Sequence, residues 1–529
     1  MIETRQTFFG KGISNFLRSK NFEYSRMVRN FDIYSDPTKM TPYRDFTAQT
    51  FAGSFTAATA RLVKFLAARN ESNDGTIQYA LGVVSGTTRG KIFIKGTAAG
   101  GGWDEATTGE DSNTGRNENL FVHYNGVLWF ARNGSHFVSY DIAANTIATT
   151  ALAITHTQVF QGLVHSKDNI LYVPYYDGTA AYIAKNNAGS WTAQALTLPS
   201  SMIPISISEY GNYLAIACKQ KNIQSGPSIV FLWDRDSSLT TLSESINWGP
   251  ESLEMIEEID GILVGVSVFA NTSTETLTVT PKLVFKAYAG GNPRAQQFLE
   301  IPLTSSTVNA NQLPTVNLTG GVAIDKQKIN NRVLFNLSVE IDSVRLDAIW
   351  AIARLADGSL SVSIDRLINN DTALTSGEPK GFFKFGDYMV VGFENNGVYA
   401  ANMTINAATY TSQTSVYETL IFGEPYLKYK LTSAGVMVEP LPAAGQVVIK
   451  YKKDEETSFT TIFTHATDDS LFHEAINIES SGAALPEFRE LTLRIESTGG
   501  AVITGYWAQA EHKADGLVAR ILQGIRGFA

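Results

Sequence analysis

A weak repeat runs through most of this chain and restricts the folds that it can adopt. From about residue 47 to 424, each unit holds a polar turn doublet, an apolar run, a Gly-containing turn and a second apolar run. Asx-Gly and related doublets suit tight hairpins because they tolerate positive φ. The apolar runs are short and rich in β-branched and aromatic residues, which indicates strands. The doublets are Asp74-Gly75, Asn125-Gly126, Asp168-Asn169, Gly211-Asn212, Asp260-Gly261, Asn330-Asn331 and Gly386-Asp387.

The spacing of these doublets predicts a β-propeller. Counted from the second residue of each doublet, the intervals are 51, 43, 43, 49, 70 and 56 residues. Periods of about 40–50 residues with four strands per unit are typical of propeller blades, which stack around a central axis. We therefore predict an all-β fold, with a β-propeller of about seven blades over residues 47–424. An array of β-sandwiches whose strands resemble one another by chance is the alternative.

The repeat ends near residue 425, and a different β pattern follows. Residues 425–513 hold a set of candidate strands whose length suits one antiparallel β-sandwich or jelly roll. Leu491, Leu493 and Ile495 alternate with polar residues, as in a strand with one buried face. Residues 514–529 place apolar side chains on one face of a predicted short helix. That helix would pack either on its own sandwich or on a neighbouring subunit.

The first 46 residues differ from the rest of the chain. They hold eight basic and five acidic residues, although the whole chain carries a net charge of −9. Aromatic residues are spread through the segment without a regular period. We predict an N-terminal docking arm at residues 1–46, which packs on another subunit through charge steering and aromatic anchors. A helix folded back on the chain's own first blade is the alternative. The expected partner-binding residues are Phe16, Arg18, Lys20, Phe22, Arg26, Arg29 and Phe31.

Composition excludes several classes of protein. The chain has 529 residues, which is enough for two or more domains, and its charged fraction of 18% is low for a coiled coil or a disordered chain. Its acidic balance disfavours general nucleic-acid binding, which depends on basic charge. A single cysteine, Cys218, leaves no intrachain disulfide. No run of 18 apolar residues and no signal-peptide pattern is present, so we expect a soluble protein made in a reducing compartment.

The sequence offers little for catalysis. No histidine pair has the spacing of a metal site, and His123 and His165 are most simply explained as polar residues flanking similar turns. Cys218 lies within an apolar run and is expected in the core. Glycoside hydrolysis needs two carboxylates that face each other, and the candidates more often cap strands or keep edges soluble. These candidates are Asp234, Asp236, Glu254, Glu257 and Glu258. We predict no enzymatic activity, no cofactor and no catalytic metal.

Three stretches resemble virion structural proteins of tailed bacteriophages. They are the aromatic-basic arm that runs into NFDIYSDPTKMTPYRDF at 30–46, the Thr/Asn/Ala-rich propeller, and residues 441–509. The last stretch is similar to accessory β-sandwich domains of phage tail proteins. The resemblance implies a structural subunit of the tail, of tube, nozzle or hub type. It also implies a virion location and partners that are other virion proteins and copies of itself.

A tail protein that binds a receptor or a glycan through propeller loops is the alternative function, and a polysaccharide-degrading enzyme is a more distant one. Sugars stack on aromatic faces, so exposed tryptophans beside loops would favour glycan binding. The candidates are Trp103, Trp191 and Trp248, and each has packing within a blade as its alternative role.

Overall fold

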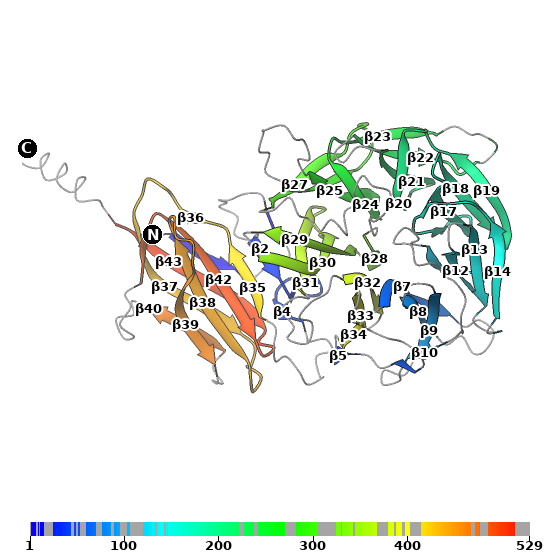
Figure 1. The fold of residues 1–529 in the computed structure, drawn as a ribbon. Helices are drawn as coiled ribbons and strands as arrows, with labels where there is room; N and C mark the ends of the chain where they lie inside the picture. Colours follow the sequence, from blue (N-terminus) through cyan, green and yellow to red (C-terminus); the bar gives the residue numbers. More distant parts are fainter. Residues whose placement is uncertain are drawn as a thin grey trace, which may run out of the picture. The chain divides into compact units, whose positions relative to one another are not determined.

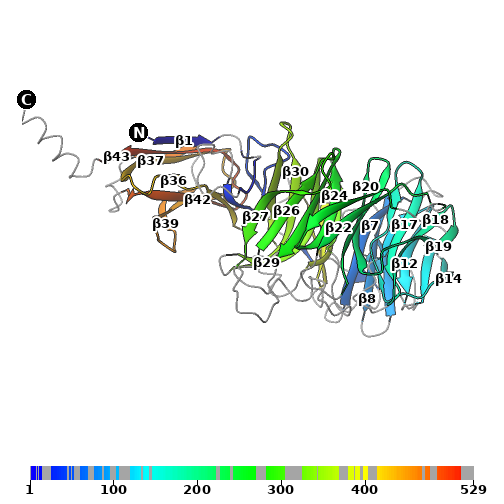
Figure 2. The same ribbon diagram turned by 90° about the horizontal axis from the view of Figure 1, so that it is seen from above.

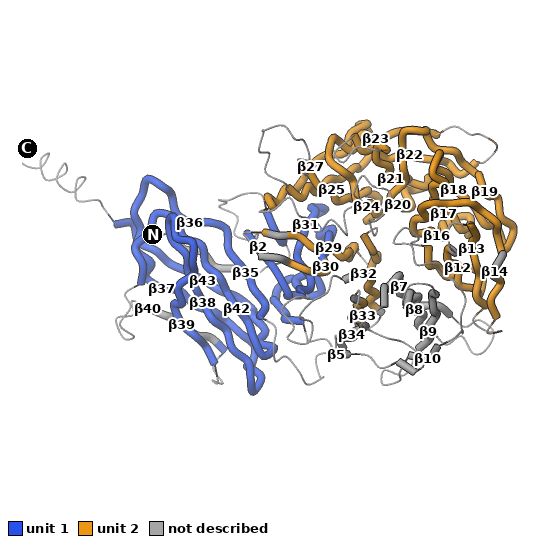
Figure 3. Tube along the Cα trace, in the orientation of Figure 1, with its two compact units in different colours: residues 1–45, 350–372, 405–529 blue, residues 46–349, 373–404 orange. Residues whose placement is uncertain are grey.

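The computed structural model divides the chain into two compact units (Figure 3). Unit 1 holds residues 1–45, 350–372 and 405–529, and unit 2 holds residues 46–349 and 373–404. Every regular element among the described residues is a β-strand. The described residues are 2–6, 9, 11–14, 25–43, 47–48, 51–52, 60–69, 77–85, 89–95, 103–105, 120–132, 135–141, 144, 146–221, 227–236, 238, 242–269, 282–303, 324–329, 331–341, 344–367, 379–385, 388–393, 397–402, 414–466, 471–476 and 485–513.

Unit 2 is built from small sheets that follow one another along the chain (Figure 1). The first contains β6 (Phe51–Ala52), β7 (Ala60–Arg69), β8 (Ile77–Ser85), β9 (Arg89–Lys95) and β10 (Trp103–Glu105). The second contains β11 (Phe121–Tyr124), β12 (Val127–Arg132), β13 (His136–Asp141) and β14 (Thr146–Ala153). The third contains β15 (Gln158–Val159), β16 (Leu163–His165), β17 (Ile170–Tyr176), β18 (Ala181–Asn187) and β19 (Ser190–Thr197).

Two further complete sheets and the ends of the unit follow the same plan. The fourth sheet contains β20 (Met202–Tyr210), β21 (Tyr213–Gln220), β22 (Ser228–Trp233) and β23 (Glu244–Gly249). The fifth contains β24 (Ser252–Ile259), β25 (Ile262–Phe269), β26 (Lys282–Tyr288) and β27 (Gln296–Pro302). Next come the hairpin of β28 (Lys326–Ile329) and β29 (Arg332–Ile341), then β30 (Val344–Arg354), within which the chain leaves unit 2. The last sheet contains β32 (Pro379–Phe385), β33 (Tyr388–Phe393), β34 (Gly397–Asn402) and β5 (Thr47–Ala48).

The sheets of unit 2 are arranged in succession around a common centre, as in a β-propeller (Figure 1). The prediction of an all-β fold made of small antiparallel sheets is therefore confirmed for the residues that the structure describes. Neighbouring sheets share their apolar side chains, because one core cluster contains Ile183 of β18, Trp233 of β22 and Leu253 of β24. No sheet of this size buries both faces alone, so each depends on its neighbours for its core.

Turn chemistry explains the hairpins within these sheets. Asn125-Gly126 adopts φ of 52° and 77°, and Asp260-Gly261 adopts 48° and 81°, the left-handed conformation that these residue types tolerate best. Gly211-Asn212 likewise forms the two-residue loop between β20 and β21. The prediction of tight hairpins is confirmed at these three doublets. Asp74-Gly75 and Gly386-Asp387 lie outside the described residues.

Unit 1 contains two larger sheets, which form separate layers (Figure 2). One has the order β1 (Ile2–Gln6), β43 (Ile503–His512), β37 (Tyr429–Val438) and β40 (Phe472–Ile476), with β41 (Glu487–Phe488) also on β37. The strands of the other sheet that belong to unit 1 have the order β31 (Leu360–Leu367), β2 (Ser25–Arg29), β35 (Ser415–Thr419), β42 (Glu490–Thr498), β38 (Gln446–Lys453) and β39 (Thr460–Ala466), with β36 (Phe422–Gly423) on β42. A small hairpin joins β3 (Phe31–Asp32) to β4 (Thr41–Pro42).

A single apolar core lies between the two layers of unit 1. Leu491, Leu493 and Ile495 of β42 are fully buried in it, together with Val436 of β37 and Tyr506 of β43. The shared face of the three apolar residues is confirmed, but the strand does not have a single buried face, because Thr492 on the opposite face is buried as well. The helix expected at residues 514–529 lies outside the described residues.

The N-terminal residues are part of unit 1. This corrects the sequence analysis, which expected them to form a separate arm. β1 pairs antiparallel with β43, and β2 lies between β31 and β35. Phe9, Val28 and Phe31 are fully buried in the unit 1 core. These pieces are too short to show a period in the sequence, because each strand has only five residues and its partners lie hundreds of residues away. Unit 1 also takes in residues 350–372 and 405–424, which the sequence analysis assigned to the propeller.

Candidate functional site

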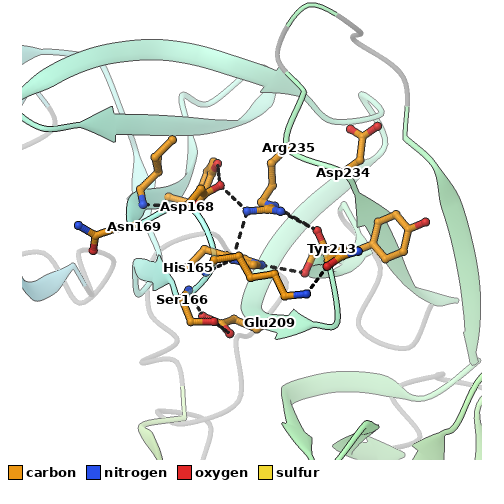
Figure 4. Close-up of polar contacts among 12 residues, drawn as sticks. His165, Ser166, Asp168, Asn169, Glu209, Tyr213, Asp234 and Arg235 are labelled. Carbon is orange, nitrogen blue, oxygen red and sulfur yellow. Dashed lines mark hydrogen bonds and ion pairs between the residues drawn. The ribbon is translucent and has the colours of Figure 1, made fainter.

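A cluster of polar side chains joins the third and fourth sheets of unit 2 (Figure 4). His165 ends β16, and the turn between β16 and β17 contributes Ser166 and Asp168. The neighbouring sheet contributes Glu209 at the end of β20, and Arg235 just after β22. The cluster brings together a histidine, carboxylates, a hydroxyl and a guanidinium, which are groups that catalytic sites commonly use.

The guanidinium of Arg235 is at the centre of the cluster. It forms an ion pair with the carboxylate of Asp168, and its Nη1 donates to His165 Nδ1 at 3.2 Å. Its Nε and Nη2 donate to the backbone oxygen of Asn212 at 3.2 and 2.9 Å. Arg235 has φ of 71°, a conformation that costs a non-glycine residue of order 1–3 kcal/mol. The four contacts thus stabilise a strained backbone.

The imidazole of His165 is fully buried and has a protein partner at each ring nitrogen. Nδ1 faces Arg235 Nη1 and also the backbone N–H of Lys167, at 3.3 Å, so it must accept. Nε2 lies 3.4 Å from the carbonyl oxygen of Tyr213 and is therefore the nitrogen that carries the proton. These partners favour one tautomer, with the ring proton on Nε2.

Asp168 and Glu209 also use their oxygens within the cluster. Asp168 accepts from the Tyr172 hydroxyl at 2.9 Å and from the backbone N–H of Ile170 at 3.1 Å. Burial, with the adjacent Asp168 carboxylate, raises the pKa of Tyr172. Glu209 accepts from the Ser166 hydroxyl at 2.7 Å. Ser166 therefore donates to a carboxylate and not to His165, so the residues in Figure 4 form no nucleophile–base pair. What the cluster can do is hold two sheets together.

Lys286 of β26 forms a buried ion pair with Glu251, which lies in the connection between β23 and β24, and reaches the fourth sheet through Trp248 of β23. Lys286 Nζ lies 2.5 Å from Glu251 Oε2 and donates to the backbone oxygen of Trp248 at 2.6 Å. The two charged side chains are only 8% and 10% exposed. In such a position each charge depends on the other, because an unpaired buried charge is costly.

The carboxylates considered for glycoside hydrolysis have separate partners. Glu257 pairs with Lys326 at 2.7 Å, and Glu258 pairs with Lys328. Lys326 also donates to the backbone oxygens of β20 and β24, so it ties three sheets together. Burial raises the pKa of Glu254, opposed by the charge of Lys219. The two aspartates lie elsewhere, beyond β22: Asp234 is exposed, and hydrogen bonds from Ser238 lower the pKa of Asp236.

The tryptophans considered for glycan binding are engaged in packing where the structure describes them. Trp248 is 1% exposed, so the glycan-facing role is wrong for it. Trp191 packs edge-on against Trp129, with ring centroids 5.1 Å apart, and also against Phe137 at 5.3 Å. These contacts support the packing role. Trp103 begins β10, and its side chain is not among those described.

The expected partner-binding residues of the arm divide into two groups. Phe16, Arg18, Lys20 and Phe22 lie outside the described residues. Arg26, Arg29 and Phe31 belong to unit 1, where Phe31 is fully buried and cannot anchor in another molecule. Burial is the main cause that lowers the pKa of Arg29, and the charge of Arg494 lowers it further.

Some residues of the inter-sheet contacts had no signal in the sequence. The doublet Asp168-Asn169 marks the turn, but its partner Arg235 lies 67 residues further along the chain. Glu251 and Lys286 are 35 residues apart and belong to no motif. The sequence held one hint of these contacts. It is the basic residue that follows a repeated strand, as in the Asp-Arg-Asp run after β22.

Cys218 occupies the core, as the sequence predicts. It is fully buried within β21, and burial raises the pKa of its thiol. Among the described residues, no three or more His, Cys, Asp or Glu side chains gather as a metal site would require. In the same residues, no helix has the length and apolarity needed to cross a membrane.

A buried histidine makes unit 2 sensitive to acid. His156 is 2% exposed, and burial lowers its pKa to about 4. The unfolded chain takes up this proton near pH 6.5, so stability present above that pH is lost as the pH falls to about 4. The loss should be about 2 kcal/mol, measured by denaturant unfolding between pH 7 and pH 4.5. His156→Gln should flatten this dependence, and equal slopes for the two proteins would contradict the assignment.

No family model and no curated protein matches this chain. Solved structures do match over most of its length. BamB from Moraxella catarrhalis covers 70% of the chain and 92% of its own, with 9% identity and a TM-score of 0.37. Drosophila Semaphorin 1a, extracellular domains 1-2, covers 68% and 88%, with 11% identity and a TM-score of 0.38. The computationally designed Ika8 protein covers 67% and 100%, with 13% identity and a TM-score of 0.36. At TM-scores below 0.5, these likenesses support no inference about function.

Proposed function

We propose that this chain is a structural subunit of a bacteriophage tail, of tube, nozzle or hub type. It assembles by protein–protein contacts with other virion proteins and with copies of itself. The observation that carries the proposal is the use of polar groups: the Arg235 cluster joins the third and fourth sheets, and buried Lys286 of the fifth sheet donates to the Trp248 carbonyl of the fourth. Such contacts suit a rigid scaffold. The sequence resemblance to virion proteins over residues 30–46 and 441–509 supplies the location.

In this proposal the scaffold is a seven-bladed propeller with a β-sandwich. Each of the five complete sheets between β6 and β27 counts as one blade. The segment that begins with the β28–β29 hairpin is the sixth blade. The seventh is β32–β34, completed by β5 from the start of the propeller sequence. This closure would join the two ends of the ring by backbone hydrogen bonds. The two layers of unit 1, which share one core, make the sandwich.

The glycan- or receptor-binding function has less support. Two of its three candidate tryptophans pack within the chain. No enzymatic step is proposed, because the carboxylates and Ser166 are engaged in contacts that hold sheets together.

Immunogold electron microscopy of phage particles, with antibodies to this chain, tests the proposal. We expect label at one fixed position on the tail axis, and a constant copy number per particle by quantitative mass spectrometry. Label on fibre tips would favour the receptor-binding alternative. Absence of the chain from purified particles would overturn the proposal altogether.

A further inference from the structure

Arg29, the last residue of β2, carries a charge that its own chain leaves without a partner. Within the described part of the chain, its guanidinium forms no hydrogen bond and no ion pair, and its Nε is sealed from solvent. A charge in such a position is costly unless an opposite charge meets it. We propose that Arg29 is the binding site of one oxyanion, a carboxylate or a phosphate group.

The strand register explains why Arg29 has no carboxylate as its direct neighbour. In β35 the residue opposite Arg29 is Val416, and in β31 it is Ile364. Both of these side chains are buried. Charged residues in a sheet normally pair with the residue directly opposite. Arg29 instead lies between two apolar residues, one on each side.

The carboxylates nearest to Arg29 already have cations of their own. Burial and the charge of Arg494 lower the pKa of Arg29, while the charges of Glu418 and Glu496 raise it. Glu418 accepts from Nε of Arg494 at 2.8 Å, and Glu496 lies 2.7 Å from Nζ of Lys450. Three cations thus share two carboxylates, and the positive charge in excess belongs to Arg29.

The chemistry of the guanidinium selects the class of ligand. Its N–H groups form a planar fork that matches a carboxylate or a phosphate through two parallel hydrogen bonds. Arg29 is half-buried, and its Nη groups, unlike Nε, are not sealed from solvent, so the ligand meets the outer end of the side chain. The oxyanion is a free ion or an acidic side chain of a partner protein. The second source would deepen the proposed function, whereas the site itself does not depend on it.

Differential scanning calorimetry of the full chain tests the site, with each oxyanion replacing chloride at constant ionic strength. We expect about 50 mM phosphate to raise the melting temperature of unit 1 by about 2–4 °C more in the unaltered protein than in Arg29→Met. The comparison cancels the general stabilisation that phosphate gives through its exclusion from protein surfaces. Lys430→Met, at an exposed lysine of β37, loses the same charge and should respond as the unaltered protein does.

Tetraglutamate is the second probe and separates the two sources of the oxyanion. An Arg29-dependent rise supports the site with either probe, and the probe that acts at the lower concentration identifies the source. Equal responses of the unaltered protein and Arg29→Met to both probes would overturn the site, and would leave the location in the virion untouched. If Arg29→Met does not fold, Arg29→Lys replaces it, because lysine keeps the charge and lacks the planar fork. It should bind the effective probe about tenfold more weakly, and an unchanged affinity would count against the site.

Discussion

Lys286→Met is expected to lower the free energy of unfolding of unit 2 by about 3–5 kcal/mol. The substitution leaves the carboxylate of Glu251 in a position that is 10% exposed, without its partner at 2.5 Å. It also removes the donor to the Trp248 carbonyl oxygen. A buried charge with no partner keeps its full desolvation cost. Denaturant unfolding at neutral pH, monitored by circular dichroism, measures the change.

Two further variants separate the effect of burial on the free energy of unfolding from the effect of charge. Lys282→Met removes the ion pair with Glu300 on the neighbouring strand, where the side chains are 30% and 34% exposed. We expect it to cost less than about 1 kcal/mol, since exposed pairs contribute little. Adding Glu251→Leu to Lys286→Met should recover much of the loss, because the unpaired charge is then gone. If Lys286→Met costs no more than Lys282→Met, the pair does not stabilise the junction.

The hairpins of the propeller were predictable because their cause is local. Asn125-Gly126 and Asp260-Gly261 are short signals that specify positive φ in the two-residue turn that they form. The same holds for the alternation in β42, where inward and outward residues follow each other within one strand. Repetition of such local units was enough to indicate small sheets in succession.

The junctions between sheets had no comparable signal. Arg235 meets His165 across 70 residues, and Lys286 meets Glu251 across 35. Neither pair lies at a fixed place in the repeat, so no spacing rule could select it. The N-terminal residues show the same limit more strongly. β2 pairs with β35, nearly 400 residues away, and its sequence gives no period long enough to reveal a strand.

Phe31→Ala is expected to destabilise the isolated, monomeric protein by about 3–5 kcal/mol in the transition of unit 1. The ring is fully buried in the core that also contains Val28, Tyr417 and Leu493. Its removal leaves a cavity among residues fixed by strand pairing, which limits the collapse of the surroundings. Differential scanning calorimetry at low protein concentration measures the effect.

The result decides between two roles for the N-terminal residues. Leu471→Ala, at a side chain that is 53% exposed in the same unit, should change stability by no more than about 0.5 kcal/mol. An arm that binds another subunit would leave the monomer unaffected by Phe31→Ala and would weaken only assembly. A brace within unit 1 lowers the melting temperature of the monomer before any partner is present. The burial of Phe31 between strands of its own chain favours the brace, and an unchanged monomer transition would restore the docking arm.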